Sequence, residues 1–155
     1  MKLRVVAPGH RMPPWVTAGW DDYARRMSRA FALELIEIRP EPRDRGKTLP
    51  QLLSAEAVRI AAACKDARVV ALDEQGEPWT TRMLAERVTR WRHEARNAAF
   101  VIGSADGLAD SVKRDADAVV ALSALTLPHG LVRVIVAEQL YRAVSLLAGH
   151  PYHRE

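Results

Sequence analysis

The sequence predicts one α/β domain whose mainly parallel sheet is covered by helices on both faces. The chain has 155 residues, which is the size of a single domain. Short apolar runs alternate along it with segments of helical periodicity, the order found in proteins with parallel sheets. Several of these runs are unbroken by polar residues, which is typical of strands buried on both faces.

The first strand and the first helix are predicted in residues 2–29. Residues 2–7 (KLRVVA) form the first apolar run. In residues 15–29, apolar side chains recur at i, i+4, i+7 and i+11, the spacing of one helix face. This stripe consists of Val16, Trp20, Tyr23 and Met27. Trp15 lies off the stripe, so it either packs at the start of the helix or stacks on a nucleic-acid base.

A strand, a loop, a helix and a buried strand follow. Residues 33–38 (LELIEI) partly alternate apolar and acidic side chains and predict a strand. Residues 39–47 hold two prolines and a glycine, which predicts a loop. Thr48 and Gln51 form a capping-box pattern that opens a helix reaching Cys64. Residues 68–72 (RVVAL) then predict a buried strand, bounded by the polar string DEQGEP.

The second half of the chain repeats this alternation. Thr80 or Thr81 can cap a helix with a new apolar stripe. The stripe consists of Leu84, Val88, Trp91 and Ala95. Buried strands are predicted at residues 98–102 (AAFVI) and 118–122 (AVVAL), with a short polar helix at Asp110–Asp115 between them. The last helix is predicted at residues 131–147.

The last helix predicts a homodimer. Leucine, valine, isoleucine and alanine cover most of its circumference, and a helix that is apolar nearly all round is buried on more than one side. The outer helices of a small single domain face water, so we expect this helix to meet a second copy of the chain. Glu138 and Arg142 stand at i, i+4 and can form a local ion pair.

The charge of the chain favours an anionic partner. It has 23 basic and 19 acidic residues, a formal net charge of +4, and its basic residues are 19 arginines and only 4 lysines. Arginine matches phosphate oxygens and stacks on bases, as nucleic-acid binding requires. The alternative is a compositional preference for arginine, with the charges spread over solvated faces.

Composition excludes several other classes of protein. With 48% hydrophobic and 27% charged residues, the chain is not an extended disordered segment. No apolar run reaches the roughly 18 residues of a membrane span, and the first residues lack the apolar region of a signal peptide. Cys64 is the single cysteine, so no internal disulfide can form, which favours a cytoplasmic protein.

Three segments are candidates for a ligand site. Ligands of open α/β sheets bind at the carboxyl ends of the strands, and residues 72–76, 103–107 and 122–129 begin where buried strands stop. The middle segment has two glycines, which let the backbone approach a ligand. The sequence holds neither of the glycine fingerprints of dinucleotide and nucleoside-triphosphate sites.

Metal and acyl-transfer chemistry are not supported. His129, His150 and His153 lack the spacing of zinc ligands, so we expect no metal site. No serine stands in a GxSxG nucleophile elbow, which argues against acyl transfer.

Several strings of the sequence match a known family. They are KLxxVAxG and MPxWV near the start, a Leu-Asp pair after the third strand, IGSADG, LSALTLPH, LVRVIVAEQLYRA and the final HPYHRE. Together they span essentially all of the chain. They closely resemble the bacterial ribosomal RNA large-subunit methyltransferases that modify pseudouridine at ring nitrogen 3, a family of the SPOUT superfamily.

This resemblance implies a fold and a methyl-donor site. The family fold is an α/β knot, in which the C-terminal segment threads a loop to form a trefoil and S-adenosylmethionine binds in a bent shape among the knotted loops. The implied donor contacts are Leu72, Gly103, Leu122, Ser123, Ala124, Leu125, Thr126 and Leu127. Backbone groups of such loops can read the adenine edge while leucine side chains hold its ring.

The substrate implied by the resemblance is a pseudouridine of 23S rRNA, in a hairpin at the subunit interface of the assembled ribosome. We expect no appended RNA-binding domain, so the arginines of this domain and of its dimer partner would bind the phosphates. Five residues match family positions near the donor pocket and are candidates for binding the target nucleotide. They are Arg133, Arg142, Tyr152, His153 and Arg154. A disordered tail is the alternative for the last four residues.

The ring nitrogen must lose a proton during methyl transfer. His129 or His153 could accept that proton, or a nearby arginine could stabilise the anion.

One loop departs from the family pattern. Family members commonly carry a GGPEG-like loop, whereas this chain has Gly103, Ser104, Ala105, Asp106 and Gly107. Loss of the second glycine stiffens the backbone and loss of the proline frees the next position. We expect a changed loop closure and donor affinity with the same class of reaction.

Two other classes of function remain as alternatives. A non-catalytic ribosome- or RNA-binding module of the same fold would share the basic surface and would not bind the methyl donor. A nucleotide-dependent oxidoreductase would share the alternating strands, but it would be expected to carry a glycine fingerprint after its first strand.

Overall fold

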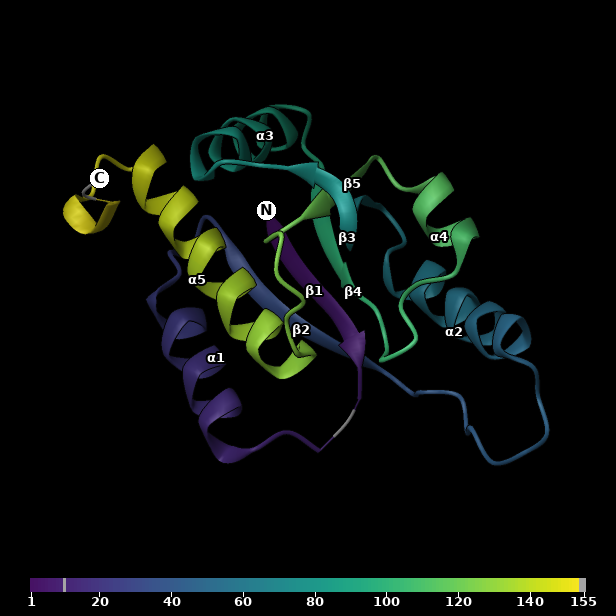
Figure 1. Cartoon of the computed structure of the whole chain (residues 1–155). Helices are drawn as coiled ribbons and strands as arrows, with labels where there is room; N and C mark the ends of the chain where they lie inside the picture. Colours follow the sequence, from purple (N-terminus) through teal and green to yellow (C-terminus); the bar gives the residue numbers. More distant parts are fainter. Residues whose placement is uncertain (10, 154–155) are drawn as a thin grey trace.

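Five parallel strands form one sheet in the computed structural model of the chain (Figure 1). The structure describes residues 1–9 and 11–153, except for the side chain of His153. The strand order is β2-β1-β4-β3-β5, which confirms the parallel sheet expected from the sequence. The strands are β1 (Lys2–Pro8), β2 (Ala32–Ile38), β3 (Ala67–Pro78), β4 (Asn97–Ile102) and β5 (Ala118–Ala121).

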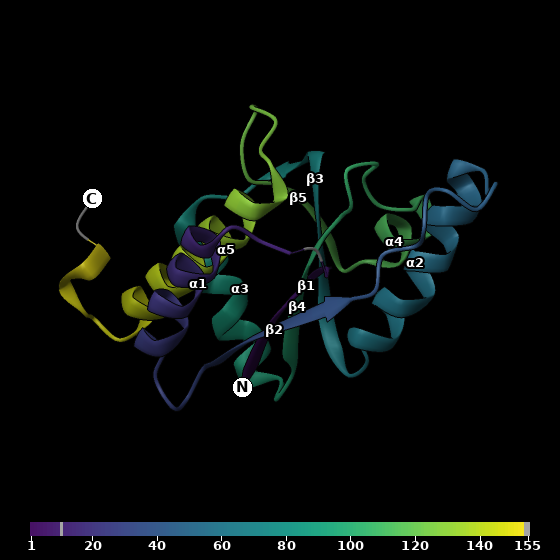
Figure 2. The same cartoon turned by 90° about the horizontal axis from the view of Figure 1, so that it is seen from below.

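Helices cover both faces of this sheet, as expected. Figure 2 shows α1, α3 and α5 on one face and α2 and α4 on the other. None of the helices in the described part of the chain is long and apolar enough to cross a membrane. The helices are α1 (Pro14–Arg26), α2 (Leu49–Ala63), α3 (Thr81–His93), α4 (Asp110–Asp115), α5 (His129–Leu147) and the short 3₁₀ helix η1 (Pro151–His153).

The strands bury side chains on both faces, which explains their unbroken apolar sequences. Successive side chains of a strand point to opposite faces. Val5 and Phe100 belong to the core under α1, α3 and α5, whereas Val6 and Val101 belong to the core under α2 and α4. A polar residue at any of these positions would be buried without a partner.

Local signals place the starts of two helices correctly. Thr80 accepts a hydrogen bond from the Met83 N–H at 3.2 Å and caps α3. Thr48 donates its backbone N–H to Gln51 Oε1 at 2.9 Å before α2, as the capping-box pattern predicts.

Three helix boundaries differ from the prediction. The helix α1 ends at Arg26, because Met27 is already extended. The helix α3 ends at His93, and Ala95 has φ +54° and is exposed, so Ala95 is part of a helix-ending turn and not of the apolar stripe. The helix α5 begins at His129, directly after Pro128.

The strand β3 is also longer than predicted. It extends to Pro78 through the polar string that the sequence indicated as its boundary. The reason is a second pairing with β5 beyond an irregular stretch of the strand, a long-range contact that local sequence does not reveal.

Candidate functional site

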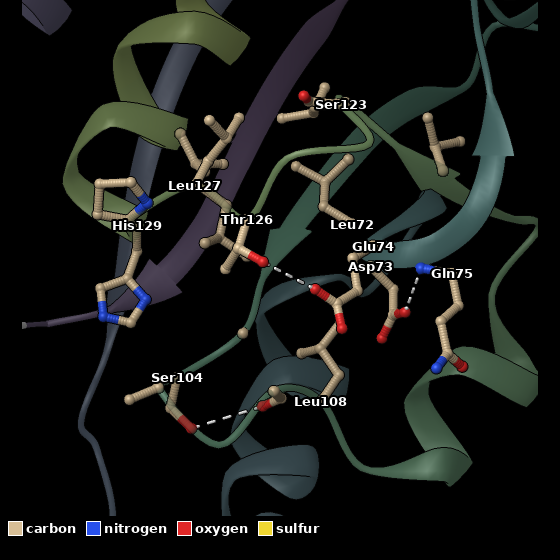
Figure 3. Close-up of a pocket in the computed structure, with 18 of the residues that line it drawn as sticks. Leu72, Asp73, Glu74, Gln75, Ser104, Leu108, Ser123, Thr126, Leu127 and His129 are labelled. Carbon is tan, nitrogen blue, oxygen red and sulfur yellow. Dashed lines mark hydrogen bonds between the residues drawn. The ribbon is translucent and has the colours of Figure 1, made fainter.

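A pocket of about 940 Å³ opens at the carboxyl ends of β4 and β5 and at the irregular stretch of β3 that begins at Leu72 (Figure 3). Its volume lies within the usual range for small-molecule sites, roughly 300–1,000 Å³. The three segments that the carboxyl-end rule selects from the sequence supply most of its walls. The expected location of the site therefore coincides with a large pocket of the structure.

An irregularity in β3 builds the first wall. Leu72 and Glu77 both pair with Val120 of β5, so the residues between them leave the sheet, and Asp73, Glu74 and Gln75 line the pocket. The chain returns to the sheet at Gly76. A Cβ at this position would lie 2.6 Å from the backbone N and C atoms of Val120, so only glycine allows the chain to return to the sheet.

A tight turn after β4 builds the second wall. The Gly107 N–H donates to the Ser104 carbonyl at 2.9 Å, and Gly107 has φ +84°, a conformation that glycine adopts readily. A Cβ on Gly103 would lie 2.7 Å from the Gly107 carbonyl carbon. Both glycines are thus required by the shape of the turn.

The segment between β5 and α5 builds the third wall. It presents apolar side chains to solvent, with Leu122 37% and Leu125 74% exposed. The Ser123 hydroxyl accepts the Leu125 N–H at 2.9 Å, and the Thr126 hydroxyl donates to Glu74 Oε2 at 3.3 Å, joining this wall to the first (Figure 3). Exposed leucines in a concave site are suited to hold a flat apolar ring.

Charged groups lie mainly on the β3 side of the pocket. Lys113 of α4 forms an ion pair with Asp73 at 3.3 Å. The hydrogen bond to Asp73 is the main cause that raises the pKa of Lys113 above its usual value, so this lysine remains a cation. No group of histidine, cysteine, aspartate or glutamate side chains suited to a metal ion occurs among the described residues.

The pocket brings together seven of the eight implied donor contacts. Leu72 and Gly103 lie on different walls, and five more residues come from the third segment. Ala124 is exposed and does not line the pocket. Asp73, Glu74 and Lys113 were not predicted individually, because side-chain roles around a bulge depend on contacts between distant segments.

The two candidate bases lie at opposite ends of α5. His129 is its first residue and lines the pocket. The helix has 19 residues, about 28 Å at 1.5 Å per residue, and η1 follows its far end (Figure 1). The backbone of His153 lies in η1, its side chain is outside the described part, and so is all of Arg154.

Tyr152 and Arg142 form a cluster near the end of α5. The Arg142 guanidinium donates to Glu138 Oε1 at 2.6 Å and lies 5.0 Å from the centroid of the Tyr152 ring. The Tyr152 hydroxyl donates to the same carboxylate at 3.2 Å, and burial is the main cause that raises the pKa of this phenol. The local ion pair of Arg142 is therefore present, and Tyr152 is ordered against α5.

Arg133 and Trp15 occupy opposite environments. Arg133 is 2% exposed; its guanidinium donates to Glu37 Oε1 at 2.6 Å and to the Pro8 carbonyl. In this arrangement it presents no surface to a nucleotide. Trp15 is 56% exposed, so packing at the start of α1 does not bury its ring, and base stacking by Trp15 stays a prediction.

The fold and site define a class of protein. A parallel α/β sheet with a large pocket at its carboxyl edge, built from glycine turns and exposed leucines, is suited to a small organic ligand. A family model described as "Predicted SPOUT methyltransferase" matches residues 1–153. The chain belongs to the SPOUT methyltransferase family and is an enzyme of that family.

Two similar proteins cover nearly the full chain. A protein of Nitrosospira multiformis named ribosomal RNA large subunit methyltransferase H is 54% identical over 155 residues, covering 99% of both chains. A protein of the same name from Burkholderia mallei is 52% identical, also over 99% of both chains.

Solved structures support the fold. A probable methylase family protein from Haemophilus influenzae aligns with a TM-score of 0.57 at 17% identity, over 96% of this chain and 66% of that one. A putative methylase family protein from Neisseria gonorrhoeae aligns with a TM-score of 0.52 at 14% identity, over 90% and 81%. The implied trefoil knot stays a prediction.

Proposed function

We propose that this enzyme transfers a methyl group from S-adenosylmethionine to ring nitrogen 3 of a pseudouridine in 23S rRNA. We further propose that its substrate is the assembled ribosome, at the subunit interface. The observation that carries the proposal is the convergence of seven of the eight implied donor contacts on one pocket, which are Leu72, Gly103, Leu122, Ser123, Leu125, Thr126 and Leu127. The names of the relatives at 52–54% identity support an rRNA substrate.

The residues of the pocket fit the proposed donor. The exposed side chains of Leu122 and Leu125 would hold the adenine ring, and the backbone groups of residues 122–127 would read its edge. Gly103 leaves the backbone of its turn accessible to a ligand. S-adenosylmethionine supplies an activated methyl group on a positively charged sulfur, so the chain's task is largely to position the reacting groups.

His129 is the preferred candidate for the base. It lines the pocket within its own chain and could accept the proton that leaves the ring nitrogen. His153 follows α5, about one helix length away from that pocket. A role for His153 as the base therefore requires that the C-terminal tail of one chain reach the pocket of a second chain.

The same geometry supports a homodimeric site. Tyr152 and Arg142 lie near the end of α5, whereas the pocket lies at its start. The helices α1 and α3 flank α5, and Leu131, Val134 and Ile135 are left partly exposed on it. We propose that a second copy covers this apolar surface, and that its Arg142, Tyr152 and Arg154 hold the target nucleotide.

The experiment that tests the proposed function is methyl transfer with labelled S-adenosylmethionine. Assembled ribosomes, free large subunits and naked rRNA, all lacking the modification, are supplied as substrates in parallel. Label is expected in 23S rRNA of assembled ribosomes, and digestion followed by mass spectrometry is expected to identify a methylated pseudouridine. Label in another rRNA or nucleoside, or no transfer to any substrate, would contradict the proposal.

A further inference from the structure

We propose that Arg43 is a positioning residue for methyl-donor binding, which fixes the turn of residues 103–107 through Ser104 and Asp106 and anchors it to the buried Glu56. The inference deepens the proposed function and rests on it, because it takes this turn as part of the donor site.

Arg43 uses every N–H of its guanidinium. Nη2 donates to Ser104 Oγ at 2.9 Å and to Asp106 Oδ2 at 2.8 Å, and Nε donates to the same Asp106 oxygen at 3.2 Å. On the other side, Nη1 donates to Glu56 Oε1 at 2.6 Å and to the Glu41 carbonyl at 2.8 Å. A guanidinium has five N–H donors in a fixed planar arrangement, so one side chain joins three segments of the chain.

Glu56 is the fixed end of this connection. It lies on α2 and is 3% exposed, and its carboxylate also accepts the Glu41 N–H at 3.0 Å. A buried carboxylate needs a charged partner, and Arg43 is its ion-pair partner. The hydrogen bond to Glu56 is the main cause that raises the pKa of Arg43.

The segment that carries Arg43 is itself tied down. Glu41 is 7% exposed and forms ion pairs with Lys47 and with Arg59, the latter at 2.5 Å. Arg59 also donates to the Arg39 carbonyl at 2.8 Å. The polar loop that the sequence predicts at residues 39–47 is thus docked against α2.

The turn of the donor site depends on Arg43 for its outer contacts. It contains no proline, and the side chain of Asp106 has no other hydrogen-bond or ion-pair partner among the described residues. Ser104 and Asp106 flank Ala105, so Arg43 fixes the turn on both sides of its tip. Both of them also line the pocket.

This arrangement predicts an effect on donor binding and not on the chemical step. A turn already held in its bound shape loses less conformational freedom when a ligand binds. Without Arg43 the turn must be ordered by the donor itself, so the donor dissociation constant rises. Once the donor is bound, the reacting groups occupy the same positions.

The test compares Arg43→Ala, Arg43→Lys, Asp106→Ala and the Arg43→Ala/Asp106→Ala double variant with the unaltered protein. Arg45→Ala is the matched control, since Arg45 is an exposed arginine of the same segment whose side chain contacts no described residue through a hydrogen bond or ion pair. Calorimetry gives the Kd for S-adenosylmethionine. Methylation of ribosomes gives the KM for the donor and kcat, and thermal unfolding checks each fold.

We expect Arg43→Ala and Asp106→Ala to raise Kd and KM for the donor about tenfold, with kcat at saturation within about threefold of the unaltered protein. Arg43→Lys should not restore binding, because lysine lacks the planar set of donors. The double variant should bind the donor no more weakly than Arg43→Ala, because both substitutions remove the same contact between Arg43 and Asp106. Arg45→Ala should bind normally.

Asp106→Ala keeps the pair of Arg43 with Glu56, so it tests the proposal even if Arg43→Ala does not fold. A folded Asp106→Ala protein with unaltered donor affinity would overturn the inference and leave the proposed function standing. A loss of kcat with unchanged KM in these variants would also overturn it. If the unaltered protein neither binds nor uses S-adenosylmethionine, the proposed function fails and the inference fails with it.

Discussion

Leu72 and Glu77 of β3 pair with the same residue of β5, Val120. The residues between them are consequently displaced from the sheet, and three of them line the proposed donor pocket. The wall of the site is therefore a product of strand pairing, and its shape depends on how closely Gly76 can approach β5.

Gly76→Ala should damage both the fold and the pocket. The added methyl group would meet the Val120 backbone at 2.6 Å, and backbone atoms in a sheet cannot move aside. We expect a loss of unfolding free energy of about 1–3 kcal/mol and weaker donor binding. Chemical denaturation and calorimetry measure the two effects.

Gly19→Ala is the control for the added methyl group. Its Cβ would meet side-chain atoms of Val134 at 3.1 Å, within a helix that favours alanine. Equal stability of the Gly76→Ala and unaltered proteins would show that the bulge of β3 is not held by this close approach.

Leu125→Ala should weaken donor binding without a loss of stability. The side chain is 74% exposed in the chain alone, so it contributes little to folding, whereas burial against the donor would stabilise the complex. We expect a Kd for S-adenosylmethionine raised roughly tenfold, measured by calorimetry.

Val58→Ala serves as its control. Val58 is 71% exposed on α2, on the opposite face of the sheet from α5 (Figure 2). Both variants should unfold at the same temperature as the unaltered protein. Equal donor affinity of the Leu125→Ala and Val58→Ala proteins would exclude a contact between Leu125 and the donor.

Two inactive variants should restore activity when combined. Gly103→Val disrupts the turn that forms one wall of the pocket, because a Cβ there would lie 2.7 Å from the Gly107 carbonyl carbon. Tyr152→Ala removes the aromatic ring of the tail, which lies beyond the far end of α5. If the pocket of one chain works with the tail of its partner, co-expressed variants form mixed dimers with one intact site. Methylation of ribosomes by the co-purified mixture measures this, and activity no higher than that of the separate variants would contradict a shared site.

Acid should release the docked segment of residues 39–47. The hydrogen bond from Lys47 is the main cause that lowers the pKa of Glu41 from 4.5 to about 2. A carboxylate with a lowered pKa in the folded state stabilises the protein above its unfolded pKa, and that stabilisation is lost as pH falls through the folded value. The contribution of Glu41 should therefore be complete above about pH 4.5 and disappear toward pH 2.

Thermal unfolding of Glu41→Gln across this range checks the prediction. The variant should unfold at a lower temperature than the unaltered protein at neutral pH, and the difference should shrink below pH 4.5. Glu86→Gln is the control, since Glu86 is exposed and makes no hydrogen bond or ion pair with the described residues. A difference between Glu41→Gln and the unaltered protein that stays constant with pH would contradict the assignment.

Local sequence was sufficient for most of the secondary structure. Unbroken apolar runs such as residues 98–102 indicated strands buried on both faces, and Thr80 and Thr48 indicated where α3 and α2 begin. These features depend on neighbours within a few residues. The rule that ligands bind at the carboxyl ends of parallel strands then located the pocket.

Contacts between distant segments could not be predicted in the same way. The return of Glu77 to β5 depends on the backbone of Val120, and the polar string between Leu72 and Glu77 alone indicates a turn. Arg43 lies in a segment whose prolines, glycine and charges predict a solvated loop. It nevertheless binds Ser104 and Asp106, which lie 61 and 63 residues further along the chain in the turn after β4. Arg133 was expected near the nucleotide, but its buried guanidinium donates hydrogen bonds to Glu37 and to the Pro8 carbonyl.

The most direct test of the central claim is a calorimetric titration of the unaltered protein with S-adenosylmethionine, with NADH and ATP titrated in parallel. A methyl-donor site at the carboxyl edge of the sheet predicts saturable binding of S-adenosylmethionine and none of NADH or ATP. Binding should be weakened by Leu125→Ala. Saturable binding of NADH or ATP, or a folded protein that binds no S-adenosylmethionine alone or with ribosomes, would contradict it.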